Sequence, residues 1–163
     1  MYSDQVAAAS FLAIMGGFIF VFLAIGVVFY VLKSLGLYNM AVNRNMENPW
    51  LAWIPIGDLY ILGSLVGEME IFGYKLTNLG IVTLAVMIGG MILSMIPFLG
   101  LIFSLAVAVY AIFLIYNLFQ NYSPNNAVLY TILSIILGLF PIFIFIVRNN
   151  NPVNSELAPP SAF

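Results

Sequence analysis

Few residues in this sequence have side chains that could do chemistry, and they are scattered. The chain has no Cys and no His, which removes thiolate and imidazole ligands and the nucleophiles and proton relays built on them. Apart from hydroxyls, what remains is ten charged side chains: Lys33, Arg44, Lys75, Arg148, Asp4, Glu47, Asp58, Glu68, Glu70 and Glu156. With a net charge of -2 and no cluster of cations to neutralise phosphates, nucleic acid is not an expected partner. We predict no metal and no other cofactor.

Asp58 is the one acid inside an apolar segment, and two interpretations of it stay open. An acid at membrane depth is by default a candidate for handling an ion or a substrate. Alternatively, Gly57 and Asp58 begin a helix, and the carboxylate caps the backbone amides of Tyr60 or Ile61. No second buried aspartate accompanies Asp58, so a paired-acid catalytic site is not expected. We predict that the protein is not an enzyme.

The composition of the 163 residues suits lipid better than water. Hydrophobic residues make up 64% of the chain and charged residues 6%, with a mean hydropathy of +1.13, whereas a soluble domain has about a quarter of its residues charged. Stretches of about 20 uncharged residues can cross a bilayer as helices, and four occur, at about 6–32, 77–96, 101–119 and 126–147. The sequence therefore predicts an all-α, polytopic membrane helix bundle with four transmembrane helices in a single domain, residues 1–148. The Pro- and Asn-rich residues 149–163 predict a disordered tail.

Residues 33–76 differ from the rest and are predicted to lie at the membrane interface. They hold most of the charges, together with Trp50, Trp53 and Tyr60, aromatic residues typical of the headgroup level. Proline, glycine and aspartate interrupt the apolar stretch 50–66, which favours a broken, interfacial or re-entrant helical segment over a further span. Positive charges mark the cytoplasmic side of a membrane protein. Because three of the four cations fall in this region, we expect it in the cytoplasm, with both termini and the turn at Pro97 outside and Arg148 as the exception.

Small residues spaced four apart let membrane helices approach closely. Such positions are Ala9, Ala13, Gly17, Gly63, Gly67, Ala85, Gly89, Ser134 and Gly138. One of these faces could drive homo-oligomerisation, or all could serve packing within the chain. Spacing alone favours packing within the chain, since small residues are enriched in membrane helix interfaces in general.

Two stretches carry a resemblance to other proteins. They are NRNMENPWLAWIPIGDLYILGSLVGE (Asn43 to Glu68) and YSPNNAVLYTILSIILGLFPIFIFIVRNNNP (Tyr122 to Pro152). They resemble segments of small multi-span membrane proteins of Gram-positive bacteria that have no assigned activity. The resemblance implies a four-span protein of the bacterial plasma membrane and carries over no functional residue.

Three functional hypotheses follow. The first is a non-enzymatic membrane protein that acts by self-association or by docking another membrane protein, with membrane lipids as its surroundings. The second is a homo-oligomeric channel or transporter subunit that uses Asp58 and the broken 50–66 segment. The third is a sensor whose region from Lys33 to Lys75 recruits a soluble protein.

Overall fold

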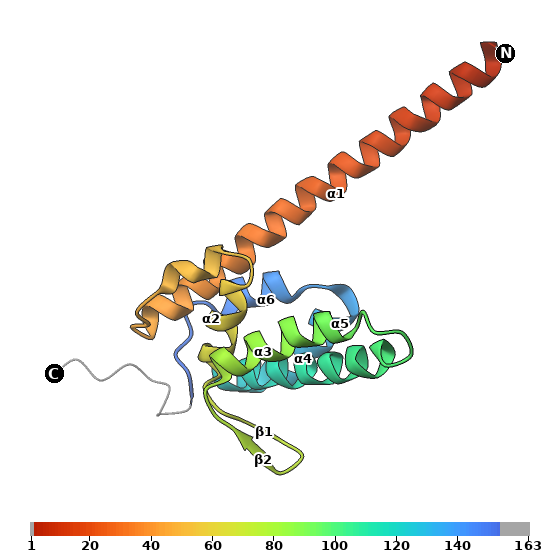
Figure 1. The fold of residues 1–163 in the computed structure, drawn as a ribbon. Coiled ribbons are helices and arrows are strands. Elements are labelled where there is room, and N and C mark those ends of the chain that lie inside the picture. Colours follow the sequence, from red (N-terminus) through yellow and green to blue (C-terminus); the bar gives the residue numbers. More distant parts are fainter. Residues whose placement is uncertain (1, 154–163) are drawn as a thin grey trace.

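The computed structural model describes residues 2–153, with side chains from Ser10 onward (Figure 1). Within that range the chain forms six α-helices, two short 3-10 helices and one β-hairpin. In chain order these are α1 (Tyr2–Asn43), η1 (Pro49–Trp53), α2 (Gly57–Val66), β1 (Met69–Ile71), β2 (Tyr74–Leu76), α3 (Leu79–Leu93), α4 (Gly100–Tyr122), η2 (Pro124–Asn126), α5 (Ala127–Leu137) and α6 (Phe140–Val147). The prediction of a mainly helical protein is confirmed.

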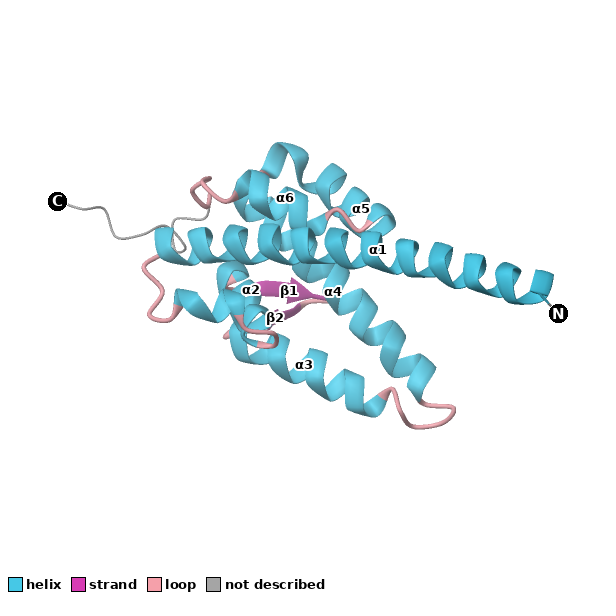
Figure 2. Cartoon of the chain, turned by 90° about the horizontal axis from the view of Figure 1, so that it is seen from above, coloured by secondary structure: helices cyan, strands magenta, loops and turns pink. Residues whose placement is uncertain are grey.

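The helix α1 is continuous through the boundary that the sequence suggested at Lys33. Neither a proline nor a turn interrupts it, and it ends at Asn43. Its C-terminal half packs between α6 and α2 (Figure 2). Its N-terminal half leaves the body of the molecule (Figure 1). The side chains of residues 10–28 are exposed on every face of the helix.

The helices α3 and α4 form a hairpin around the turn at Pro97. At 1.5 Å per residue, the 23 residues of α4 extend about 34 Å, but the 15 residues of α3 extend only about 22 Å. The Thr83 Oγ1 atom and the Tyr110 hydroxyl oxygen, 2.7 Å apart and buried, join the two helices. The expected span at 77–96 is therefore corrected: it is a shorter helix that ends at Leu93.

The expected fourth span at 126–147 is also corrected, because the structure breaks it into two helices. Gly138 takes the left-handed conformation (φ 66°) and ends α5 after 11 residues. Pro141 then lies in the first turn of α6, which has 8 residues. Glycine tolerates a positive φ and proline starts a helix readily, so this pair of residues makes a turn where uniform hydropathy suggested a single rod.

The residues that flank α5 and α6 meet at one end of the molecule. The Asn150 side-chain amide donates to the Tyr122 carbonyl (2.8 Å), and the Asn43 amide donates to the Arg148 carbonyl (3.3 Å). The segment formed by α5 and α6 therefore turns back at Gly138. Its last residues return to the end of the molecule at which α5 begins. In place of one continuous helix at 126–147, the structure thus has two short helices that pack against each other.

Among the helices of residues 2–153, two are long and apolar enough to cross a membrane, judged by length and composition. They are Ser10–Asn43 within α1 and Gly100–Tyr122. The expectation of four such helices is thus reduced to two. Much of the outer surface of α3, α4 and α5 is also apolar, with Ile81, Met91, Leu101, Leu105 and Ile136 more than half exposed.

The polar connection between α2 and α3 is a β-hairpin that the sequence did not lead us to expect. The strands β1 and β2 pair antiparallel with Glu70 opposite Lys75. Phe72 and Gly73, with φ of 50° and 84°, form the two-residue turn, in which both central residues need a positive φ. The Phe72 ring lies against that of Phe113 on α4.

The core lies where α2, α4 and α6 meet the C-terminal half of α1. Its fully buried side chains include Leu37, Met40, Ile61, Leu65, Leu114, Leu118, Phe119 and Ile144. Phe119 makes edge contacts with the rings of Tyr130, Phe140 and Phe143. This core fixes the end of α1 relative to α2, and so positions the polar side chains that those two helices carry.

Candidate functional site

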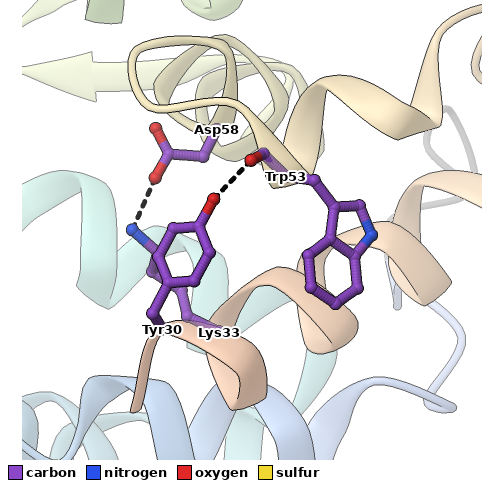
Figure 3. Close-up of polar contacts among 4 residues, drawn as sticks. All are labelled: Tyr30, Lys33, Trp53 and Asp58. Carbon is purple, nitrogen blue, oxygen red and sulfur yellow. Dashed lines mark hydrogen bonds and ion pairs between the residues drawn. The ribbon is translucent and has the colours of Figure 1, made fainter. Parts of the chain in front are cut away.

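The central feature of the candidate site is an ion pair between α1 and α2. The Lys33 Nζ atom lies 2.5 Å from the Asp58 Oδ2 atom, and the two side chains are 28% and 10% exposed (Figure 3). One turn earlier on α1, the Tyr30 hydroxyl donates to the Trp53 carbonyl at the end of η1. These two contacts fasten the broken segment 50–66 to α1 at the level where α1 leaves the body.

The ion pair bears on one of the two interpretations of Asp58, the helix cap. The residue that precedes α2 is Ile56, with φ 78°, and it makes no side-chain cap. Within the described residues, the Asp58 carboxylate accepts a hydrogen bond from Lys33 and none from the amides of Tyr60 or Ile61, so the expected cap is not formed. Its charge still lies in the first turn of α2, where the helix dipole favours an anion.

Lys33 is the partner that sequence reasoning did not supply for Asp58. The sequence suggests Lys33 as the boundary of the first span, whereas it lies inside α1, ten residues before the helix ends. No local pattern connects residues 25 positions apart on two different elements. A single Lys-Asp pair of this kind can hold two elements together or exchange its partners.

The predicted interface anchors surround the level of the Lys33–Asp58 pair, where α1 leaves the body of the molecule. Trp50 and Trp53 are 53% and 38% exposed, and the Trp50 indole N–H donates to the Asn48 side-chain oxygen (3.3 Å). Tyr60 lies half-buried on α2. Exposed indoles at one height of a mainly apolar protein are typical of the headgroup region of a bilayer.

A polar cleft lies next to this aromatic region, where α1 ends and faces α2. Its volume is about 310 Å³, and its lining residues are Arg44, Asn45, Met46, Glu47, Asn48, Tyr60, Ile61 and Ser64. The Arg44 Nη1 atom donates to the Ser64 carbonyl (2.6 Å), which holds the guanidinium against α2. Sequence reasoning did not identify this cleft, because its residues come from a turn and from one face of a helix that is 10 residues long.

Asparagine side chains close the same end of the molecule. Besides the bonds of Asn43 and Asn150, the Asn121 side-chain amide donates to the Val66 carbonyl at the end of α2 (3.1 Å). The backbone carbonyl of Asn121 accepts from the Val153 N–H (2.8 Å). The first residues of the expected disordered tail are thus bonded to α4, and residues 154–163 lie outside the described part of the chain. We call this the polar end, defined by Asn43, Arg44, Val66, Asn121 and Asn150.

The predicted small-residue positions have different surroundings. Gly63 packs tightly, because an added Cβ would lie 2.2 Å from the Leu79 carbonyl oxygen. Gly17 and Gly89 have no atom within 4 Å of such a Cβ, and Ser134 is buried with no hydrogen-bond partner for its hydroxyl among the described residues.

The remaining small residues of this set that the structure describes lie at helix ends or on the surface. Gly67 and Gly138 have positive φ and end α2 and α5. Ala13 and Ala85 are exposed, and the side chain of Ala9 lies outside the described residues. Gly36 on α1 and Gly80 on α3, which were not in the predicted set, also pack tightly: an added Cβ would lie 2.4 and 2.3 Å from side-chain atoms of Ile144 and Ser64.

No group of three or more His, Cys, Asp or Glu side chains that could hold a metal ion occurs in the described part of the chain. No protein family, no curated protein and no solved structure matches this chain.

Proposed function

We propose that this chain is an integral membrane protein that acts, without catalysis, by associating with a second membrane helix through its N-terminal helix. The observation that carries the proposal is the uncovered part of α1. Residues 10–28 extend about 28 Å at 1.5 Å per residue, close to the ~30 Å thickness of a hydrocarbon core. They are apolar and exposed on every face, an arrangement that is unfavourable in water and favourable in lipid.

Within residues 10–153, the rest of the molecule leaves this segment free for a partner. The bundle packs against α1 only from about residue 29 onward. Gly16, Gly17 and Gly26 have nothing within 4 Å of a built Cβ, so another helix could approach the backbone there, as small residues in membrane helices allow. A second copy of the chain is the occupant to test first.

Disulfide crosslinking tests this association, and the absence of native cysteine makes single-Cys variants unambiguous. Ala13→Cys and Gly17→Cys lie on one face of α1, four residues apart, and Met15→Cys lies on the opposite face as the matched control. In nanodiscs at low copy number, we expect covalent dimers from the first two variants and not from the third. A monomeric mass with no crosslink at any of the three positions would exclude self-association and redirect the search to a different membrane protein.

The proposed arrangement in the membrane places the polar end in the cytoplasm. Three cations were already assigned there, and Arg148, the exception in the sequence analysis, lies in the structure beside Asn43 at that same end. All four Lys and Arg residues then lie on or next to one side, in agreement with the positive-inside tendency. The helices α5 and α6 form a re-entrant hairpin in this arrangement, because both of its ends reach the polar end.

Thiol labelling in intact vesicles tests the arrangement. Tyr74→Cys in the β-hairpin and Val153→Cys after α6 are both well exposed positions. An impermeant maleimide should label both from the same side of the membrane. Labelling from opposite sides would contradict the proposed arrangement, because the chain would then cross the bilayer an odd number of times between residues 74 and 153.

A second function, transport, is favoured by one observation. The Lys33–Asp58 pair joins α1 to the broken segment, and ionisable residues within a membrane protein commonly mark a pathway. Loss of an ion or substrate flux in Asp58→Asn protein with unchanged assembly would favour this function over association.

A further inference from the structure

The polar cleft between the end of α1 and α2 contains one cation and one acid that are not paired with each other. Arg44 and Glu47 both line it, yet the ion pairs among the described residues are Lys33–Asp58 and Lys75–Glu68. Opposite charges that share a cleft without touching leave room for a ligand that carries both signs. We propose that this cleft binds a headgroup that joins a phosphate to a primary ammonium, as in phosphatidylethanolamine.

Arg44 is suited to hold the phosphate. Its guanidinium is already oriented, because the Nη1 atom donates to the Ser64 carbonyl at 2.6 Å. A guanidinium carries five N–H donors, so donors remain for a ligand, and Arg binds phosphate through two parallel hydrogen bonds where geometry permits. The side chain is partly buried, which strengthens such a contact relative to one in open water.

Glu47 supplies the selectivity of the proposed site. A carboxylate accepts hydrogen bonds from a primary ammonium, whereas the quaternary ammonium of choline has no N–H to donate. A headgroup with a phosphate and no ammonium, such as phosphatidylglycerol, would meet the Glu47 charge without compensation. The arrangement therefore favours ethanolamine over both alternatives.

The position and size of the cleft agree with a lipid headgroup. Its Asn48 is bonded to the exposed indole of Trp50, which marks headgroup depth in the proposed arrangement. The volume of about 310 Å³ is at the small end of ligand pockets and suits a headgroup without its acyl chains. This inference rests on the proposed membrane insertion.

Native mass spectrometry of the full chain in mild detergent tests the site directly. Short-chain phosphatidylethanolamine, phosphatidylglycerol and phosphatidylcholine are titrated separately, and the bound fraction is compared. We expect a preference for phosphatidylethanolamine of about tenfold, as expected for one charge-assisted hydrogen bond. Equal binding of the three lipids would overturn the proposal.

Two variants separate the roles of the charges. Glu47→Gln, at an exposed position, should shift the preference toward phosphatidylglycerol. Arg44→Gln should remove the preference among the three lipids. Glu70→Gln in the β-hairpin is the control and should leave it unchanged. Because Arg44 also contacts α2, its variant could fail to fold, but Glu47→Gln alone decides the matter: an unchanged preference in that variant overturns the proposal.

A last arm identifies the source of the ligand. Free phosphoethanolamine that displaces the lipid at the same concentration would support the chemistry and assign a soluble ligand, while displacement only by intact lipid supports a membrane source. Alkaline extraction of membranes distinguishes a failure of the proposed membrane insertion from a failure of the proposed headgroup site. Protein released by carbonate contradicts membrane insertion, whereas protein that is retained but shows no headgroup preference contradicts only the headgroup site.

Discussion

Substitution of Asp58 by Asn should destabilise the protein, and the structure allows the size of the effect to be worked out. Two unit charges about 4 Å apart attract by roughly 4 kcal/mol at an effective dielectric constant near 20, and part of this is offset by desolvation. Breaking one partner of a fully buried pair costs about 3–5 kcal/mol, and an exposed pair contributes about 1 kcal/mol or less. With Lys33 28% exposed and Asp58 10% exposed, we expect a loss of about 2–3 kcal/mol in the free energy of unfolding, between these limits.

The chain provides a matched control for this prediction. The pair between Lys75 and Glu68 has the same 2.5 Å separation but side chains that are 68% and 41% exposed. Glu68→Gln should therefore lower the free energy of unfolding by less than about 1 kcal/mol. The same distance in two surroundings isolates the effect of burial.

The measurement is reversible unfolding in mixed micelles, followed by circular dichroism, as a double-mutant cycle. Lys33→Met combined with Asp58→Asn removes both charges, and the double variant should recover much of the stability lost in Asp58→Asn, with a coupling of about 1.5–2.5 kcal/mol. If Asp58→Asn costs no more than Glu68→Gln, or if the two single effects simply add, the pair does not hold α2 to α1 and the reasoning is wrong.

Three further predictions use the packing of the helices, and each is checked by the same unfolding measurement. Gly63→Ala should destabilise by about 1–3 kcal/mol, because its Cβ would lie 2.2 Å from a backbone oxygen of α3, whereas Gly89→Ala, with open space around it, should be neutral or stabilising. Thr83→Val should lower the free energy of unfolding by about 1–2 kcal/mol, because it leaves the buried Tyr110 hydroxyl without its partner. Adding Tyr110→Phe to this variant should lower the free energy of unfolding by less than Thr83→Val did. Gly138→Ala should cost about 1 kcal/mol because residue 138 has φ 66°; a neutral effect would show that the turn between α5 and α6 is not fixed.

The helical class and the extent of α4 could be predicted from the sequence because they depend on local properties. A long run of uncharged, apolar residues predicts a helix in lipid and in a protein core alike. The polar residues after Phe119 marked the end of α4 to within three residues. Pro49 and Pro124 begin η1 and η2, as the fixed φ of proline favours.

The turn within residues 126–147 was missed because hydropathy measures composition and not direction. A chain that enters an apolar layer and returns has the same average hydropathy as one that crosses it. The signal that separates the two was present, as Gly138 followed by Pro141, but glycine and proline are also common within membrane helices. What decides the matter is the contact of Arg148 with Asn43, which joins residues 105 positions apart.

The functional contacts were unpredictable for a related reason. The contact that Asp58 makes depends on Lys33, whose Nζ atom lies 2.5 Å from the Asp58 Oδ2 atom because the core packs α2 against α1. The polar cleft depends on the turn after Asn43, where Asn45 takes a positive φ. Local spacing carries no information on either, because both arise from tertiary packing.

The return of α5 and α6 to the polar end has a consequence for how the protein is made. Between Leu76 and Arg148 the sequence has no charged residue, and in the proposed arrangement the residues after Arg148 stay on the side where they are synthesised. Insertion of this half of the chain would then transfer no charge and no polar tail through the hydrocarbon. Translocation would be needed for the N-terminal segment alone, and the C-terminal half could partition into the bilayer as apolar hairpins after it leaves the ribosome.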